Sequence, residues 1–449
     1  MSIVKITIIH SIYKPDTRGG AETVVENIVS GLKNKSRDVF VISVGRKNLV
    51  EDIDGIKVYR IKPFNLFNFL DINKKPVWLH LPWHIIDMFN EIQCWRIYKI
   101  LMKERPDVAL THNLKGLGYY TSWLLRNLKI KNIHTVHDMQ LLHPSGLIKV
   151  ETGHPAFAGH GVPSLPAKIY AQFCKKLFGS PAIVIFPSQY IKSIYEKYGF
   201  FPKSERVVLG NPIVISPVET GHPAFAGHGV PSLQKDGINI LFLGQIEEYK
   251  GIFELINAAK KINGDLTLHI VGEGKALACV KELAAGDERI KFYGRLSHEE
   301  IEQKIWPNID LLINPSKTPE SFGLVVVEAL AHGVPAIVSG LGALPELVIE
   351  GETGFIFSFS RPSGFMSLRA KRSNLINLFM RLLRPLCFAR GPRNDNSTVL
   401  SGTDDLEQKI IWCIENKEKL AAMKEKCFEE AKKYDLNLYI DKLINYAKK

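Results

Sequence analysis

The stretch Glu320-Ser-Phe-Gly-Leu-Val-Val-Val-Glu328 decides how this chain is interpreted. The apolar run 309–313 before it is typical of a buried strand, which here ends at a Pro-Ser turn. A helix then begins at Phe322-Gly323, so its free N–H groups face the carboxyl edge of the strand and favour an anion such as a diphosphate. The two carboxylates would therefore contact different parts of one ligand, because eight residues of continuous helix rise about 12 Å.

Apolar runs and helical periodicities alternate along the chain, which indicates repeated βα units and a parallel sheet covered on both faces. The expected strands are 4–9, 39–44, 108–111, 133–136 and 183–186, then 238–243, 266–271, 290–293, 311–313 and 336–338. The expected helices of the first half are 20–33, 84–104, 116–128 and 167–178. Two such halves predict an α/β protein with two doubly wound domains, whose ligands bind in a cleft outside the carboxyl ends of the strands.

Two motifs of the first half lie at expected strand ends. Gly19-Gly20 opens the helix 20–33, where glycine lets the backbone approach a ligand and the helix N-terminus favours anions; an ordinary βα turn is the alternative. His137 follows the strand 133–136 and could orient a hydroxyl group of a ligand or be a hydrogen-bonded core histidine. Asp138 is expected to support the turn or to orient His137.

Two motifs of the second half occupy equivalent positions. Gly244-Gln245 starts a turn that leads to Lys250-Gly251, and Lys250 is either a phosphate ligand or a solvated lysine at a helix start. Gly272-Glu-Gly274 forms a second turn. A dinucleotide fingerprint would need glycine at 277, where leucine stands, so NAD binding is not expected.

The composition is that of an ordinary globular protein of 449 residues with a net charge of +12. Seven arginines and one lysine against one aspartate give segment 361–396 a charge of +7 and leave +5 elsewhere, so specific nucleic-acid binding is not expected. The six cysteines show no CxxC pair, and the first residues enter a strand pattern directly. No apolar run approaches about 20 residues. These features favour a cytoplasmic protein with reduced thiols.

The Glu-x7-Glu stretch, the Lys-Gly pair at 250–251 and the T-x-H-D at 135–138 resemble motifs of the GT-B glycosyltransferases of family 4. The resemblance covers roughly 1–218 and 234–449, and it implies two Rossmann-like domains facing a cleft. It implies that Glu328 binds the ribose of a sugar nucleotide and that Glu320 lies near the transferred sugar. It also implies that Lys250 contacts the diphosphate.

Further roles are implied by the same resemblance. His137, Glu320 and Lys250 are the expected catalytic residues, and the backbone amides at Phe322-Gly323-Leu324 would join Lys250 in stabilising the departing diphosphate. The remaining donor-binding candidates are Gly19, Gly20, Gln245, Gly272 and Gly274. Gln245 departs from the family pattern, which has arginine there; glutamine lacks the charge and the fork of arginine.

The expected division is an acceptor-side domain 1–212, a linker 213–237, a nucleotide-sugar domain 238–435 and a helix 436–449 that crosses back. Three segments interrupt the family pattern. Residues 150–165 recur identically at 218–233, and 361–396 has a different composition from its surroundings. All three are expected to be surface loops, since loop-closure entropy grows slowly with length.

No metal and no cofactor are expected, because the nucleotide sugar is a substrate. Asp52-Ile-Asp54 matches a metal-binding D-x-D pattern, but the glycine at 55 favours a turn. The histidines of the repeat lack a ligand framework.

The predicted function is metal-independent transfer of a hexose from a nucleotide sugar to a hydroxyl of a glycan or lipid-linked saccharide, as in polysaccharide biosynthesis. The resemblance implies retention at the anomeric carbon. The alternatives are sugar-nucleotide epimerisation, phosphorolysis, or an inactive binding protein damaged by the insertions. Aromatic and basic residues between Trp78 and Lys103 indicate either a peripheral contact with the inner face of a membrane or a buried amphipathic helix.

Overall fold

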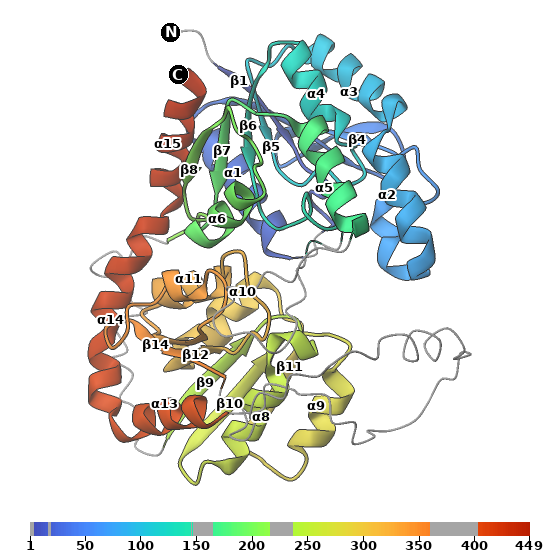
Figure 1. Cartoon of the computed structure of the whole chain (residues 1–449). Helices are drawn as coiled ribbons and strands as arrows, with labels where there is room; N and C mark the ends of the chain where they lie inside the picture. Colours follow the sequence, from blue (N-terminus) through green and yellow to red (C-terminus); the bar gives the residue numbers. More distant parts are fainter. Residues whose placement is uncertain (1–3, 17–18, 145, 147–164, 216–236, 360–402) are drawn as a thin grey trace, which may run out of the picture.

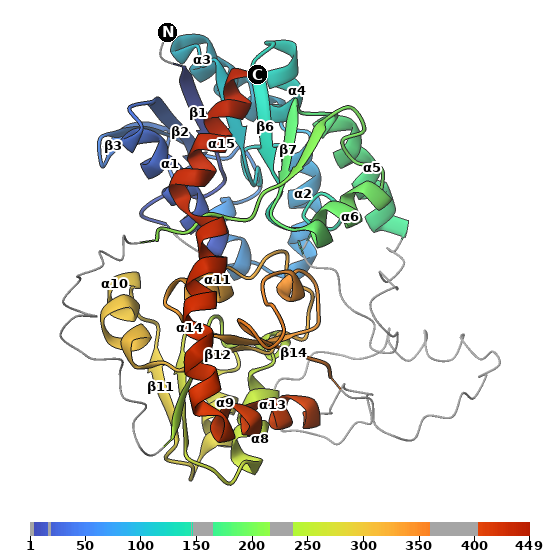
Figure 2. The same cartoon turned by 90° about the vertical axis from the view of Figure 1, so that its left-hand side faces the viewer.

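The computed structural model describes the chain except residues 1–3, 17–18, 145, 147–164, 216–236 and 360–402. The three expected insert loops therefore lie outside the described residues, apart from the last residue of the first insert, Leu165, where a helix begins. Two α/β halves are stacked one above the other, and the last two helices run down one side of both (Figures 1 and 2).

The first half contains a sheet in the order β3-β4-β2-β1-β5-β6-β7-β8, parallel except for the β3–β4 hairpin. Its strands are β1 Lys5–Ile9, β2 Asp38–Val44, β3 Leu49–Ile53, β4 Ile56–Ile61, β5 Val108–Thr111, β6 Lys131–Thr135, β7 Ile183–Phe186 and β8 Glu205–Val208. Its helices are α1 Gly20–Asn34, α2 His80–Met88, α3 Glu91–Glu104, α4 Tyr120–Asn127, α5 Leu165–Phe178 and α6 Gln189–Lys197. Helix α1 covers one face of this sheet, and α3 to α6 cover the other with Trp83 of α2.

The second half has a parallel sheet in the order β11-β10-β9-β12-β13-β14. Its strands are β9 Ile238–Leu243, β10 Leu266–Val271, β11 Ile290–Gly294, β12 Leu311–Asn314, β13 Ala336–Ser339 and β14 Gly354–Phe357. Its helices are α8 Ile252–Lys261, α9 Leu277–Ala284, α10 His298–Glu300, α11 Leu324–Ala331, α13 Asp404–Glu415 and α14 Lys417–Ala431. Helices α8, α9, α13 and α14 pack on one face of the sheet, and α11 packs on the other.

Helix α15 (Leu436–Lys448) returns to the first half, where its apolar side packs on α1. A side chain at Gly31 of α1 would place its Cβ 2.7 Å from Ile440 Cγ1, so the close approach of the two helices requires glycine there. The crossing begins where Ile213 and the chain around Asp435 exchange backbone hydrogen bonds of 2.9 Å.

Two local expectations were incomplete. The stretch 84–104 is divided between two helices. Asn90 lies between them, and its side chain caps α3 by accepting from the Gln93 N–H at 2.9 Å. The expected strands did not include β3, β4, β8 and β14. Strands β3, β8 and β14 lie at sheet edges, and β3 and β8 are also short and polar. Asp52 lies at the β3–β4 turn, where its carboxylate accepts from the Gly55 N–H at 2.8 Å.

Candidate functional site

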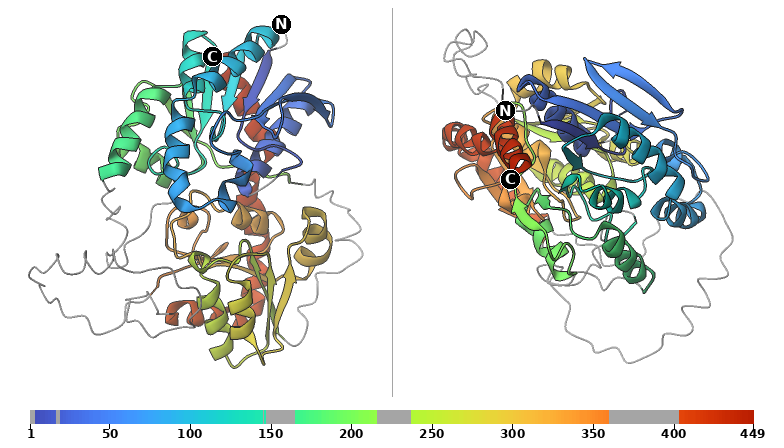
Figure 3. Two further views of the ribbon diagram at one scale, coloured as in Figure 1. Left: turned by 90° about the vertical axis from the view of Figure 1, so that its right-hand side faces the viewer. Right: turned by 90° about the horizontal axis from the view of Figure 1, so that it is seen from above.

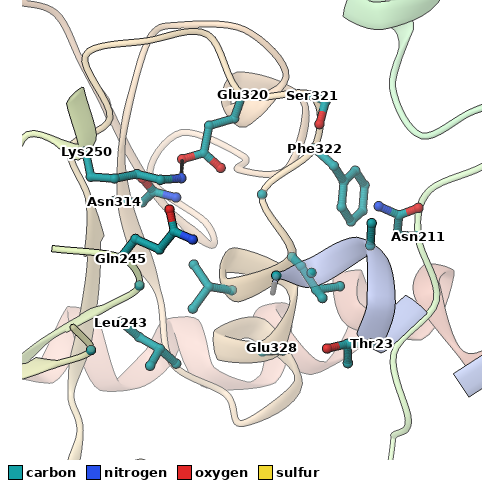
Figure 4. A pocket seen from close by; sticks show the side chains of 18 of the residues that line it. Thr23, Asn211, Leu243, Gln245, Lys250, Asn314, Glu320, Ser321, Phe322 and Glu328 are labelled. Carbon is teal, nitrogen blue, oxygen red and sulfur yellow. Dashed lines mark hydrogen bonds and ion pairs between the residues drawn. The ribbon is translucent and has the colours of Figure 1, made fainter. Parts of the chain in front are cut away.

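A cavity of about 960 Å³ lies between the two halves and is lined by residues from both. The turns that follow β6, β9, β10 and β12 open into it, which places it at the carboxyl ends of parallel strands. Figure 4 shows its central part, with α1 approaching α11. Gly20 at the start of α1 faces Leu324 at the start of α11, at 3.5 Å from an ideal Cβ to Leu324 Cδ2.

The Glu-x7-Glu stretch forms a turn followed by a short helix. Helix α11 begins at Leu324 after Gly323, whose φ of +117° is one that glycine adopts without strain. Glu320 therefore precedes the helix and is held by the backbone: its carbonyl accepts from the Ala343 N–H at 2.9 Å. Phe322 is buried against Tyr434 and orients the turn. The residues Phe322–Val325 at the start of α11 thus line the cavity together with Glu320 and Glu328.

Lys250 and Glu320 form an ion pair within the cavity wall, with Lys250 Nζ 2.9 Å from Glu320 Oε1 (Figure 4). Burial by itself would lower the pKa of Lys250, but the charge and hydrogen bond of Glu320 outweigh it and raise that pKa. Lys250 is therefore a cation at neutral pH. Gln245 lines the same wall and accepts a hydrogen bond from the Tyr249 hydroxyl at 2.9 Å.

Glu328 lies on α11 and faces the cavity without a partner among the described side chains. Burial raises the pKa of its carboxyl group. Nearby, His332 stacks on Trp306 with ring centroids 4.8 Å apart, and its ring nitrogens contact the Glu328 carbonyl and the Glu302 carboxylate, each at 2.8 Å. The arrangement leaves the Glu328 carboxylate available to accept hydrogen bonds from a ligand.

His137 reaches the cavity from the end of β6. Its Nε2 lies 2.8 Å from Nδ1 of His112, and burial lowers the pKa of His137 to about 4. The imidazole is therefore neutral at physiological pH and acts through hydrogen bonds. Asp138 supports the turn, because its carboxylate accepts from the Gln140 N–H at 2.7 Å.

The glycine candidates divide into two groups. Gly19, Gly20 and Gly272 line the cavity, whereas Gly274 is absent from its wall. A Cβ at Gly274 would overlap the carbonyl of Ile246, so close packing between two turns accounts for this glycine. Its assignment to donor binding came from the family resemblance, in which this turn faces the nucleotide.

Several lining residues were not singled out from the sequence. They are Thr23, Glu26 and Asn27 on α1, then Asn211, His298, Glu302, Asn314 and His332. Thr23, Glu26 and Asn27 share one face of α1, the helix that Gly19-Gly20 opens. Their spacing along the sequence could therefore have indicated these three residues. Glu26 Oε1 is buried without a hydrogen-bond partner, and burial raises the pKa of this carboxyl group.

The histidines, cysteines and acids of the described ranges contain no group of three or more arranged to hold a metal ion. Within those same ranges, no helix combines the length and the apolarity that crossing a membrane requires.

Comparison with known proteins agrees with this architecture. The model described as Glycosyltransferase Family 4 matches residues 18–216, and the one described as Glycosyl transferases group 1 matches 228–366. An uncharacterized glycosyltransferase of Methanocaldococcus jannaschii is 32% identical over 382 residues, which span 84% of this chain and 90% of that protein. An uncharacterized protein of the Klebsiella pneumoniae cps region is 26% identical over 77% of this chain and 87% of its own length.

A solved Anabaena protein in complex with UDP and glucose has the same fold, with a TM-score of 0.63, 18% identity and 99% of each chain covered. The expected fold class is thereby confirmed. Both sheets are parallel apart from the β3–β4 hairpin, and the cavity lies between the two halves. Together with these relatives and family matches, this shows that the chain belongs to the GT-B glycosyltransferases of family 4.

Proposed function

We propose that the protein transfers a hexose from a nucleotide sugar to a hydroxyl of a glycan or lipid-linked saccharide, with retention and without a metal ion. The observation that carries this proposal is a single cavity lined by the cationic Lys250, by the residues that start α11 and by Glu328, for which no ion pair is found among the described residues. A diphosphate fits between the lysine and the amides, where its developing charge is stabilised as the sugar departs. The Glu328 carboxylate then accepts from the ribose hydroxyls.

The sugar and the acceptor occupy the part of the cavity that faces the first half. The neutral His137 imidazole orients a hydroxyl of the transferred sugar, and Glu320 is held next to that sugar by Lys250. The bond from the anomeric carbon to the diphosphate breaks while a bond to the acceptor oxygen forms, and the proton of the acceptor hydroxyl passes to the departing diphosphate. Family membership supports retention. UDP-glucose is the first donor to test, because a protein of the same fold binds UDP and glucose.

The test is a panel of nucleotide sugars incubated with the protein, with and without saccharide acceptors. A donor at 100 times its Kd stabilises the fold by about 2.7 kcal/mol, so binding is seen as a thermal shift. Transfer predicts release of the nucleoside diphosphate only when an acceptor is present. An epimerised sugar nucleotide in the donor-only reaction would establish epimerisation instead, and a sugar phosphate formed with inorganic phosphate would establish phosphorolysis. Binding without any product would indicate an inactive binding protein.

Changing Gln245 to Arg is expected to tighten donor binding about fivefold. Arginine adds a charge-assisted bond to the diphosphate, which is worth about 1 kcal/mol more than a neutral one. The measurement is donor affinity by calorimetry, and Gln245→Met controls for the loss of the bond from Tyr249. Equal donor affinity in the wild type and a folded arginine variant would argue against diphosphate at this wall.

Changing Glu26 to Gln is expected to raise the acceptor KM about tenfold with donor affinity unchanged. The buried, unpartnered Oε1 of Glu26 can accept from an acceptor hydroxyl, and a bond to a charged group contributes about 1.5–3 kcal/mol. Steady-state kinetics in both substrates separates the two effects. A change in donor affinity alone would place Glu26 on the donor side.

A further inference from the structure

One side of the first half is unusually apolar. Eleven of the 21 large hydrophobic side chains that the described chain exposes lie on or beside α2, α3, α4 and α5. We call this set the α2–α5 face; it consists of Trp78, Leu81, Ile85, Phe89, Ile92, Trp95, Tyr98, Met102, Trp123, Ile169 and Phe173. Figure 3 shows these helices on the outer side of the first sheet. Soluble monomers rarely leave so large an apolar surface in water, so this one is expected to have a partner.

Helix α3 shows how the surface arises. Its inner side buries Ile97 and Leu101 in the core, as an amphipathic helix should. Its outer side repeats the apolar spacing with Ile92, Trp95 and Met102, all exposed. A helix that is apolar on two opposite sides is normally covered on both. The core covers only one of them.

Aromatic ring contacts link the parts of this surface on α2, α4 and α5. Phe89, after α2, packs edge-on against Phe173 of α5 with centroids 5.5 Å apart. The same Phe89 ring lies 6.4 Å from Tyr120, which lies 6.0 Å from Trp123 of α4. Trp78, at 73% exposed, extends the surface beyond the start of α2.

The charges around this surface are positive. The exposed lysines of this region are Lys74, Lys75, Lys99, Lys103, Lys168 and Lys176. Lys99 Nζ lies 3.4 Å from the ring centroid of Trp95. The described residues of α2–α5 include three acids: Asp87 is buried, Glu104 is bonded to Lys5 and Lys57, and Glu91 is exposed. Tryptophan, tyrosine and lysine together are typical of surfaces that lie in the headgroup region of a bilayer.

We propose that the α2–α5 face docks on an anionic lipid bilayer, with its aromatic side chains in the headgroup region and its lysines on the lipid phosphates. Anionic lipids attract each such lysine, and the apolar side chains lose contact with water. This extends the peripheral contact considered for residues 78–103 to four helices, and the exposure of Trp78 and Trp95 excludes a buried amphipathic helix as their explanation.

The α2–α5 face is also connected to the cavity. Asp87 of α2 accepts from the Gly116 N–H at 3.0 Å, and the adjacent Lys115 Nζ donates to the Pro144 carbonyl at 2.8 Å. The turn that contains Pro144 continues to Gly146, which lines the cavity. A docked protein would therefore hold its acceptor side near the membrane. If the proposed transfer function is right, the acceptor is a membrane-borne, lipid-linked saccharide.

The first test is flotation of the full chain with phosphatidylcholine vesicles, with and without phosphatidylglycerol. We expect binding that requires the anionic lipid and weakens with salt. Changing Trp78 and Trp95 together to Ser should weaken it about tenfold for each side chain. The matched control changes Leu438 and Ile349, which are also exposed but lie elsewhere, to Ser and should leave binding unchanged.

The second test changes charge instead of apolar area. Replacing Lys99 and Lys103 by Gln should lower binding to anionic vesicles about fivefold for each lysine. Replacing the exposed pair Lys426 and Lys442 by Gln removes the same two positive charges from other surfaces. This control should have little effect on vesicle binding. An equal loss in both pairs would show that total charge, including that of segment 361–396, drives binding, and would overturn the proposal.

Two other outcomes also overturn it: absence of wild-type binding to anionic vesicles, or a wild-type dimer that the tryptophan changes dissociate. The second would make the surface an interface between copies of the chain. These assays contain no donor, so their failure leaves the proposed sugar transfer intact. Failure of donor binding would remove the transfer reaction and leave the vesicle result standing.

Discussion

We expect the Lys250→Ala variant to lose about 10²–10³-fold in kcat, the largest effect of any single change in this site. Lys250 is the cation of the cavity wall whose Nζ lies 2.9 Å from Glu320, and its raised pKa keeps it charged at neutral pH. When the diphosphate departs, this charge stabilises the negative charge that develops on it. Alanine removes that stabilisation and leaves the Glu320 carboxylate unpaired near the incoming phosphates.

A second lysine of similar setting provides the control. Lys317 pairs with Glu254 at 2.7 Å, and both side chains are largely buried, yet Lys317 is outside the cavity wall. Lys317→Ala should lower the stability of the fold, while the kcat of the folded variant should stay within a few-fold of the wild-type value. Lys250→Arg retains the charge and should recover part of the rate. If the two alanine variants lose kcat equally, Lys250 supports the fold and does not act on the leaving group.

We expect the Glu328→Ala variant to bind the donor about 10–150-fold more weakly. The Glu328 carboxylate faces the cavity without a described partner, so alanine breaks no internal ion pair. A hydrogen bond to a charged group contributes about 1.5–3 kcal/mol, which corresponds to this range. Calorimetry with the nucleoside diphosphate is the direct measurement. Unchanged affinity in a folded variant would remove Glu328 from the donor site.

The same carboxylate predicts a pH dependence. Burial raises the pKa of Glu328 in the free protein, and ribose hydroxyls donate to the ionised form. Donor affinity should therefore be full above this pKa and fall as the pH drops through it. Both phosphates of a nucleotide sugar carry only a strongly acidic group and stay ionised there, so the decisive comparison is Glu328→Gln, whose donor affinity should be weaker and should lack this pH dependence. Parallel profiles for the two proteins would contradict the prediction.

The regular parts of the fold follow from local pattern. Strands such as 183–186 and 311–313 are continuous apolar runs because parallel strands are buried on both faces, and such runs are visible without an alignment. Edge strands lack this pattern. Strand β3 has the sequence Leu-Val-Glu-Asp-Ile and is mostly exposed, so its pairing with β4 depends on tertiary contact.

The candidate site shows the same division. The turn chemistry at Gly323 and Gly20 indicated helix N-termini at a strand edge, and both line one cavity. The pairing of Lys250 with Glu320 could not be read from the chain, because 70 residues separate them and only the sheet order brings them to 2.9 Å. Gly274 shows the converse: packing against Ile246 requires a glycine there whether or not the donor contacts it.

The amino-acid sequence by itself determined the βα alternation, the two halves and the Glu-x7-Glu turn, because period and turn residues act over a few positions. Only the tertiary structure decided which apolar surfaces are covered. The sequence of α3 is equally compatible with a buried helix and with one that faces a partner, since Ile97 and Trp95 are both apolar. The core covers Ile97 and leaves Trp95 55% exposed, because a helix on the outside of a sheet has only one side in contact with it.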